Sequence, residues 1–151
     1  MDLSQASTVY LHSVDEVSSY DIRPQFQADV GMSMELLITM KQTYTTTDTE
    51  QLSVAQRKCI FQGEYELKYY DENIYSLSAC MKQCRMQTAL KLCKCVPPFY
   101  QTATGKYQQC MLSDIKCLND NQKEITNIRG CKDCELSCLS TVYESEKLIK
   151  K

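Results

Sequence analysis

The stretch SACMKQCRMQTALKLCKCVPPFY, residues 78–100, decides the fold class of this chain. It places four cysteines, Cys80, Cys84, Cys93 and Cys95, within sixteen residues and then reaches a double proline. Cysteines at this spacing serve as metal ligands, as redox centres or as part of a disulfide framework. The rest of the sequence has to separate these three uses.

The distribution of cysteine favours a disulfide framework. All ten cysteines lie between Cys59 and Cys138, and the first 58 residues contain none. An even number at this density is typical of an oxidising compartment. The N-terminal residues, MDLSQASTVYLHS, nevertheless lack a secretory signal, and apolar runs such as LLI are far shorter than the about 20 residues of a membrane helix. We therefore expect a piece of a longer exported protein whose targeting and membrane segments lie outside this sequence.

Charge and motif content argue against two large classes of function. Seventeen basic and nineteen acidic residues give a formal net charge of -2, so we expect no nucleic-acid partner. His12 is the only histidine, and no nucleophile, phosphate-loop or zinc-protease motif is present. Neither a catalytic residue nor a cofactor is predicted.

The first 58 residues have the pattern of β-strands. In STVYLHSVDE, Val9 and Leu11 fall on one face of a predicted strand that ends at an acidic turn. A second strand is expected at residues 33–44, before the polar run TTTDTE. The intervening residues 18–30 contain Pro24 and are predicted to be a connecting loop.

Helices are predicted among the cysteines, which makes the fold class α+β. Residues 75–92 carry apolar or cysteine side chains at steps of three and four: Leu77, Cys80, Met81, Cys84, Thr88 and Leu92. Pro97 and Pro98 are expected to end this helix. A shorter helix is expected from Ser113, as its cap, toward Ile128, with Gly130 as its stop.

The spacing of the cysteines suggests a nested pairing. Cys80 and Cys84 stand one turn apart on a helix face, and CKDCELSC supplies three cysteines to a segment that returns antiparallel past it. Such a passage joins early cysteines to late ones: Cys59 with Cys138, Cys80 with Cys134, Cys84 with Cys131, Cys93 with Cys117, and Cys95 with Cys110. Ten cysteines allow about 945 pairings, so spacing alone leaves others open. Five nested bridges, each worth about 3 to 4.5 kcal/mol in the chain-entropy model, would make a stiff arm.

Metal binding and redox catalysis fit the cysteines less well. CKC and CKDC together would supply four thiolates to a tetrahedral zinc ion, but six cysteines would remain unused. Only Cys131 and Cys134 have the CxxC spacing of a zinc knuckle. A redox role for CKDC would require a βαβ context that the sequence does not predict.

Several segments match a known family when they are taken in order. They are VYLHSVDE, QRKCIFQGEYELKYY, YSLSACMKQCRMQTALKLCKCVPPFY and CKDCELSCLSTVYESEK, together with Cys110 and Cys117. Over about residues 8–146 the chain resembles the extracellular domain of the degenerin/epithelial sodium channel family, and it is most similar to the insect pickpocket branch. The cysteine constellation is the most specific part of this resemblance.

The resemblance implies an architecture and a function. Members of this family are trimeric, amiloride-sensitive sodium channels with two membrane helices per subunit and a hand-shaped ectodomain. By resemblance, residues 1–58 are partial palm strands, residues 59–138 are a thumb with nested disulfides, and residues 139–151 return toward the palm. The implied partners are the other subunits of a homo- or heterotrimer, sodium ions in a pore outside this sequence, and an extracellular ligand, protons or mechanical load as the stimulus.

Three features depart from the family pattern. Asp15 and Glu16 match the acidic pair of acid-sensing members, but the positions of the facing carboxylates read Asn119 and Lys123. CKDC is one residue longer than the expected CxC, and Gln56 replaces a tryptophan before the first thumb cysteine. The alternatives to an extracellular channel fragment are a free secreted disulfide-rich binding module and a cytosolic zinc-binding protein.

Overall fold

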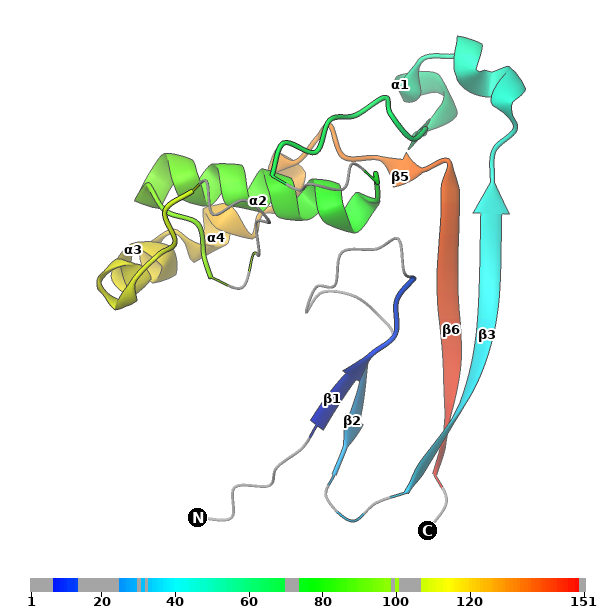
Figure 1. Ribbon diagram of the computed structural model, residues 1–151, viewed down its shortest axis with the longest axis horizontal. Coiled ribbons are helices and arrows are strands. Elements are labelled where there is room, and N and C mark those ends of the chain that lie inside the picture. The colour runs from blue at the N-terminus through cyan, green and yellow to red at the C-terminus, as the bar shows by residue number, and fades with distance from the viewer. Residues whose placement is uncertain are drawn as a thin grey trace.

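A long two-stranded ribbon carries a helical arm at one of its ends in the computed structural model (Figure 1). The structure describes residues 7–13, 25–29, 31, 33–69, 74–98, 100 and 107–149. Strands and helices are both present and five disulfides cross-link them, so the α+β prediction is confirmed.

The ribbon consists of β3 (Met34–Tyr44) and β6 (Leu139–Ile149), which pair antiparallel along their whole length. Residues directly opposite each other share a face, so β3 presents its apolar side chains mainly on one face of the ribbon. Lys41 Nζ lies 2.6 Å from Glu144 Oε1 on the other face, and both side chains are more than half exposed. An exposed pair of this kind adds less than about 1 kcal/mol, so the ribbon depends mainly on its backbone ladder.

A second pair of strands lies on the same side of the ribbon as the arm (Figure 1). These strands, β1 (Ser7–Tyr10) and β2 (Gln25–Ala28), are antiparallel. The strand predicted from STVYLHSVDE is therefore present, although it is shorter than expected. The prediction of a loop for residues 18–30 is wrong for β2, because Phe26 is buried and gives this short segment an apolar side chain to pack.

Helical turns join the ribbon to the arm, in a region that the sequence predicted to be β. They are the 3₁₀ turn η1 (Thr47–Gln51) and α1 (Val54–Arg57), which ends at Lys58 with a left-handed φ of 58°. Immediately afterwards β4 (Cys59–Ile60) pairs in parallel with β5 (Leu136–Ser137). The base of the arm is thus formed by two short strands that are more than 70 residues apart in sequence.

The main helix of the arm, α2 (Leu77–Cys93), confirms the prediction for residues 75–92 with shifted ends. The hydroxyl of Ser76 accepts a hydrogen bond from Ala79 N at 3.1 Å and caps the first turn. Lys94 ends the helix in a left-handed conformation, with φ 61°. The helix therefore stops before Pro97, and the prediction that the two prolines end it is wrong.

The buried surface of α2 is wider than the predicted stripe. Cys80 is fully buried as expected, but Leu77, Cys84 and Leu92 are only partly buried. The other buried positions lie mostly beside the stripe: Ala79, Lys82, Gln83, Arg85, Met86 and Ala89. The prediction was incomplete because segments before and after α2 cover further sides of it, forming one cluster around Ile60 and Tyr75 and another around Met86 and Val96.

The second predicted helix is divided into short pieces. They are η2 (Leu112–Asp114), α3 (Ile115–Asp120), α4 (Gln122–Ile125) and η3 (Ile128–Gly130). Ser113 is not the cap, because it lies within η2, whose N-cap is Met111, and the N-cap of α3 is Asp114. The break falls at Asn121, whose backbone N–H and side-chain amide both donate to the Cys117 carbonyl, at 3.1 and 2.9 Å.

Candidate functional site: a cross-linked arm and its joint

Five disulfides run along the arm and use all ten cysteines. The bonded pairs have Cα atoms 4.9 to 5.9 Å apart, and each pair lies inside the sequence interval of the preceding one. They are Cys59 with Cys138, Cys80 with Cys134, Cys84 with Cys131, Cys93 with Cys117, and Cys95 with Cys110. These are the pairs of the nested order. The sulfurs that a zinc site would need as thiolates are all joined to one another.

The two central disulfides fix α2 to the returning chain. Cys80 and Cys84 are one helical turn apart and bond to Cys134 and Cys131 respectively. The extra residue of CKDC is accommodated by a turn in which Cys134 N donates to Cys131 O at 3.2 Å. This longer spacing therefore still allows two adjacent bridges to leave one face of α2.

Two further disulfides close the far end of the arm. Cys93, the last residue of α2, bonds to Cys117 in α3. Cys95 bonds to Cys110, and a pair of backbone hydrogen bonds through Val96 supports this disulfide: Val96 N donates to Gln108 O and Cys110 N to Val96 O, both at 2.9 Å. Covalent and backbone contacts thus hold the end of α2 against the following loop.

Tyr75 links the start of α2 to the return segment without a covalent bond. Its hydroxyl donates to the Glu135 carbonyl at 2.6 Å, and its ring is 1% exposed. Burial raises the pKa of this phenol to about 12, against the smaller opposing effect of the Glu135 hydrogen bond. The side chain of Gln62 pairs with the Tyr75 backbone through both of its polar atoms, at 2.6 and 2.8 Å.

Gln83 fixes a neighbouring segment to the middle of α2 by side-chain hydrogen bonds. Its side-chain oxygen accepts from Lys68 N at 2.6 Å, and its nitrogen donates to Glu66 O at 3.2 Å. This side chain is 2% exposed, so the two bonds satisfy a buried amide while fixing the chain that covers the helix. A search for apolar periodicity does not find such a residue, because the buried group is polar.

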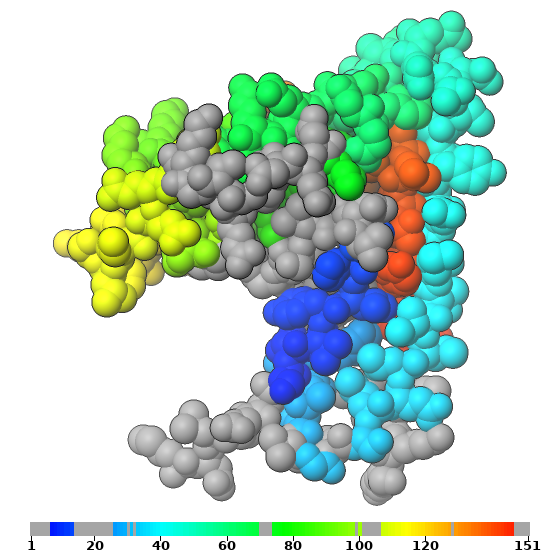
Figure 2. Space-filling model, in the orientation of Figure 1, coloured from blue at the N-terminus to red at the C-terminus, as the bar shows by residue number. Residues whose placement is uncertain are grey.

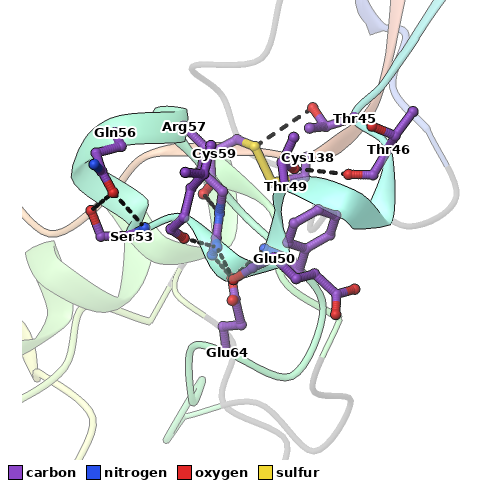
Figure 3. A network of polar contacts seen from close by, with 12 residues as sticks. Thr45, Thr46, Thr49, Glu50, Ser53, Gln56, Arg57, Cys59, Glu64 and Cys138 are labelled. Atoms are coloured by element: carbon purple, nitrogen blue, oxygen red, sulfur yellow. Dashed lines mark hydrogen bonds and ion pairs between the residues drawn. A yellow bond between two sulfur atoms is a disulfide. The ribbon is translucent and has the colours of Figure 1, made fainter.

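Arg57 is the centre of the joint between the ribbon and the arm (Figure 3). Its guanidinium donates to Cys59 O at 2.9 Å, to Leu52 O at 2.7 Å and to the Glu64 carboxylate. It also lies 4.9 Å above the centre of the Phe61 ring. The side chain is 3% exposed, which makes it a buried cation with several acceptors.

Glu64 and Gln56 complete this joint. The Glu64 carboxylate also accepts from Phe61 N at 2.8 Å, within a turn in which Gly63 adopts a φ of 87°. The side chain of Gln56 accepts from Ser53 N at 3.0 Å and closes the first turn of α1. Its role here is therefore local. The Ser53-x-x-Gln56 spacing was a sequence signal for this turn, whereas the partners of Arg57 had no such signal.

The structure describes two of the four remaining residues that the resemblance singled out. Asp15 and Glu16 lie outside the described residues. Asn119 and Lys123 are exposed near the far end of the arm. Among the residues described, no group of three or more histidine, cysteine or acidic side chains is placed to hold a metal ion, and no helix is long and apolar enough to cross a membrane.

Comparison with known proteins gives one consistent family. Residues 2–149 match the family described as amiloride-sensitive sodium channel. The chain is 30% identical over 135 residues to the sodium channel protein Nach of Drosophila virilis, which covers 85% of this chain and 35% of that protein. It is 28% identical over 107 residues to pickpocket protein 11 of Drosophila melanogaster, covering 70% of this chain and 20% of that protein. The chain thus spans about a third or less of the length of these relatives.

Proposed function

The chain belongs to the amiloride-sensitive sodium channel family, which is a channel family and not an enzyme family, and we propose that it is an extracellular part of a channel subunit. In this role the arm receives a stimulus outside the cell and passes it through the ribbon to a pore.

The disulfide-linked arm is the observation that best supports this proposal. Five nested bridges restrict the relative movement of α2 and the return segment, so that the arm moves as a unit. Disulfides at this density belong to an oxidising compartment, which is consistent with the extracellular side of a membrane. We propose the nested pairing for the native protein as well.

The boundaries and partners follow from the same proposal. Residues 1–58 would be part of a palm-like β region, residues 59–138 a thumb, and residues 139–151 a return segment. The subunit would assemble with two others into a homo- or heterotrimer that conducts sodium ions. Asp15 and Glu16 would form an acidic pair that takes part in gating.

A chimeric channel tests this proposal. Residues 8–149 replace the matching segment of the Drosophila virilis Nach protein, and the chimera is expressed in oocytes. We expect an amiloride-sensitive sodium current. In a second chimera with Cys59→Ser and Cys138→Ser we expect surface expression with altered gating, because the bridge at the base of the arm is absent.

Surface labelling keeps the test decisive when a chimera fails to conduct. An epitope inserted after Leu112, which is 86% exposed, should bind antibody on intact cells. Binding only after permeabilisation would contradict the extracellular location. Secretion of the expressed native protein without any membrane association would instead favour a free binding module.

A further inference from the structure

One disulfide joins two cysteines that are both partly exposed. Neither Cys93 nor Cys117 is buried, whereas every other bonded pair contains at least one buried cysteine. Thiol–disulfide exchange begins with the attack of a thiolate on a disulfide sulfur, so access strongly affects its rate. Exposure therefore singles out this bond for reaction with dissolved thiols.

The accessible disulfide lies at the protruding end of the arm. In Figure 2 the residues around α3 form the far end of the arm, well away from the ribbon. Lys94 follows Cys93 directly and Lys116 precedes Cys117, and both lysines are exposed. Asp114 and Asp120, three residues before and after Cys117, offset part of this positive charge, and the exposed Lys91, two residues before Cys93, adds to it. A negatively charged thiolate would therefore approach an end of the arm at which exposed lysines outnumber the carboxylates.

The surroundings of the two sulfurs favour one direction of attack. Cys93 ends a helix of 17 residues, where the negative end of the helix dipole would disfavour a thiolate leaving group. The sulfur of Cys117 instead lies 3.6 Å from Asn121 Nδ2, a donor that can stabilise a thiolate, although the Leu92 carbonyl at 3.8 Å opposes part of this effect. Cys117 is thus the better leaving group, and Cys93 is the sulfur to be attacked.

We infer that the bond between Cys93 and Cys117 is a reversible modification site for small anionic thiols such as glutathione. The thiolate sulfur bonds to Cys93 Sγ, the bond to Cys117 Sγ breaks, and its electron pair leaves with Cys117, which then takes a proton from water. A second thiol releases Cys93 and carries away the oxidised thiol dimer. Two thiols are oxidised and one disulfide is reduced.

The expected consequence is a local change in the arm. The disulfides on either side, Cys84 with Cys131 and Cys95 with Cys110, remain closed and retain the rest of the arm. Only the anchorage of α3 to the end of α2 is released. The site itself does not depend on the proposed function, but its significance as a regulator of gating does.

Timed reduction of the whole chain tests this inference. The oxidised protein is incubated with reduced glutathione, quenched with an alkylating reagent and mapped by mass spectrometry. We expect Cys93 and Cys117 to become modified at least about tenfold faster than any other pair, with the early glutathione adduct on Cys93. The positively charged thiol cysteamine should open the bond more slowly than glutathione does when their rates are compared at equal thiolate concentration.

Two variants give the controls. In the protein with Cys93→Ser and Cys117→Ser the early reaction should vanish while the other four pairs keep their rates. In Asn121→Ala the early reaction should slow by a few-fold. Earlier opening of another pair, or simultaneous opening of all five, would overturn the inference while leaving the proposed function intact. Ten free thiols before any reductant is added would overturn both.

Discussion

Removal of the bridge between Cys84 and Cys131 gives a quantitative test of the nested arm. Considered alone, this bridge joins residues separated by 47 positions and would stabilise the fold by about 4 kcal/mol in the chain-entropy model. It lies inside the bridge between Cys80 and Cys134, however. With that outer bridge intact, the inner one closes a ring of about seven residues, four on the helix side and three on the return side. The expected loss on replacing both inner cysteines by serine is therefore only about 2.4 kcal/mol.

The outermost bridge provides the matched comparison. Together with its inner neighbour, the bridge between Cys59 and Cys138 encloses a ring of about 25 residues, which corresponds to about 3.5 kcal/mol. The free energy of unfolding of both double-serine variants is measured by urea titration under non-reducing conditions. We expect the inner variant to lose less stability than the outer one.

Single substitutions decide whether these cysteines are partners. Cys84→Ser should leave one reactive thiol, at Cys131, and Cys131→Ser should leave one at Cys84. Each single variant should lose about as much stability as the double variant, because either change removes the same bond. Additive losses, or a free thiol at any other cysteine, would refute the nested pairing.

Three further predictions concern noncovalent contacts. Tyr75→Phe should lower stability by about 1 to 3 kcal/mol in urea titration, because the buried Glu135 carbonyl loses its donor; an unchanged value would show that water replaces the hydroxyl. Because burial raises the pKa of Tyr75 from 10 to about 12, the unfolded chain loses the phenolic proton first, so stability should hold below pH 10 and fall toward pH 12. This loss of unfolding free energy should be at most about 2.7 kcal/mol, and solvent screening reduces it further. Brief alkaline unfolding experiments measure the loss, which should be smaller in Tyr75→Phe. Arg57→Gln should cost about 1 to 3 kcal/mol, because two carbonyls lose their donor and Glu64 keeps only the Phe61 N–H, whereas exposed Lys58→Gln, the matched control, should cost less than about 0.5 kcal/mol.

The sequence was most informative where residues of one type recur at a fixed spacing. Cys80 and Cys84, one turn apart, predict a helix face and a returning chain, and both are present. Residues 33–44 predicted a strand from composition, and β3 occupies nearly that range. In these places local preference and tertiary contacts favour the same structure.

The sequence was less informative where a distant contact decides the structure. Arg57 acquires its partners from η1, β4 and the turn at Glu64, and no local pattern links these segments. Gln83 is buried because its amide satisfies two backbone groups, which a search for apolar residues cannot detect. The second predicted helix is divided at Asn121, although the overall periodicity there is helical.

The position of Cys138 determines how movement of the arm would reach the ribbon. It is the single residue between β5, which belongs to the arm, and β6, which belongs to the ribbon. Cys138 N donates to Ile60 O, its carbonyl accepts from Thr45 N at 2.8 Å, and its sulfur is bonded to Cys59. The arm and the ribbon are consequently joined at Cys138 without a flexible linker that could absorb a displacement of the arm. Rotation at the tip would be delivered as torsion to the first residues of β6, and the twist of the strand would carry it along the ribbon.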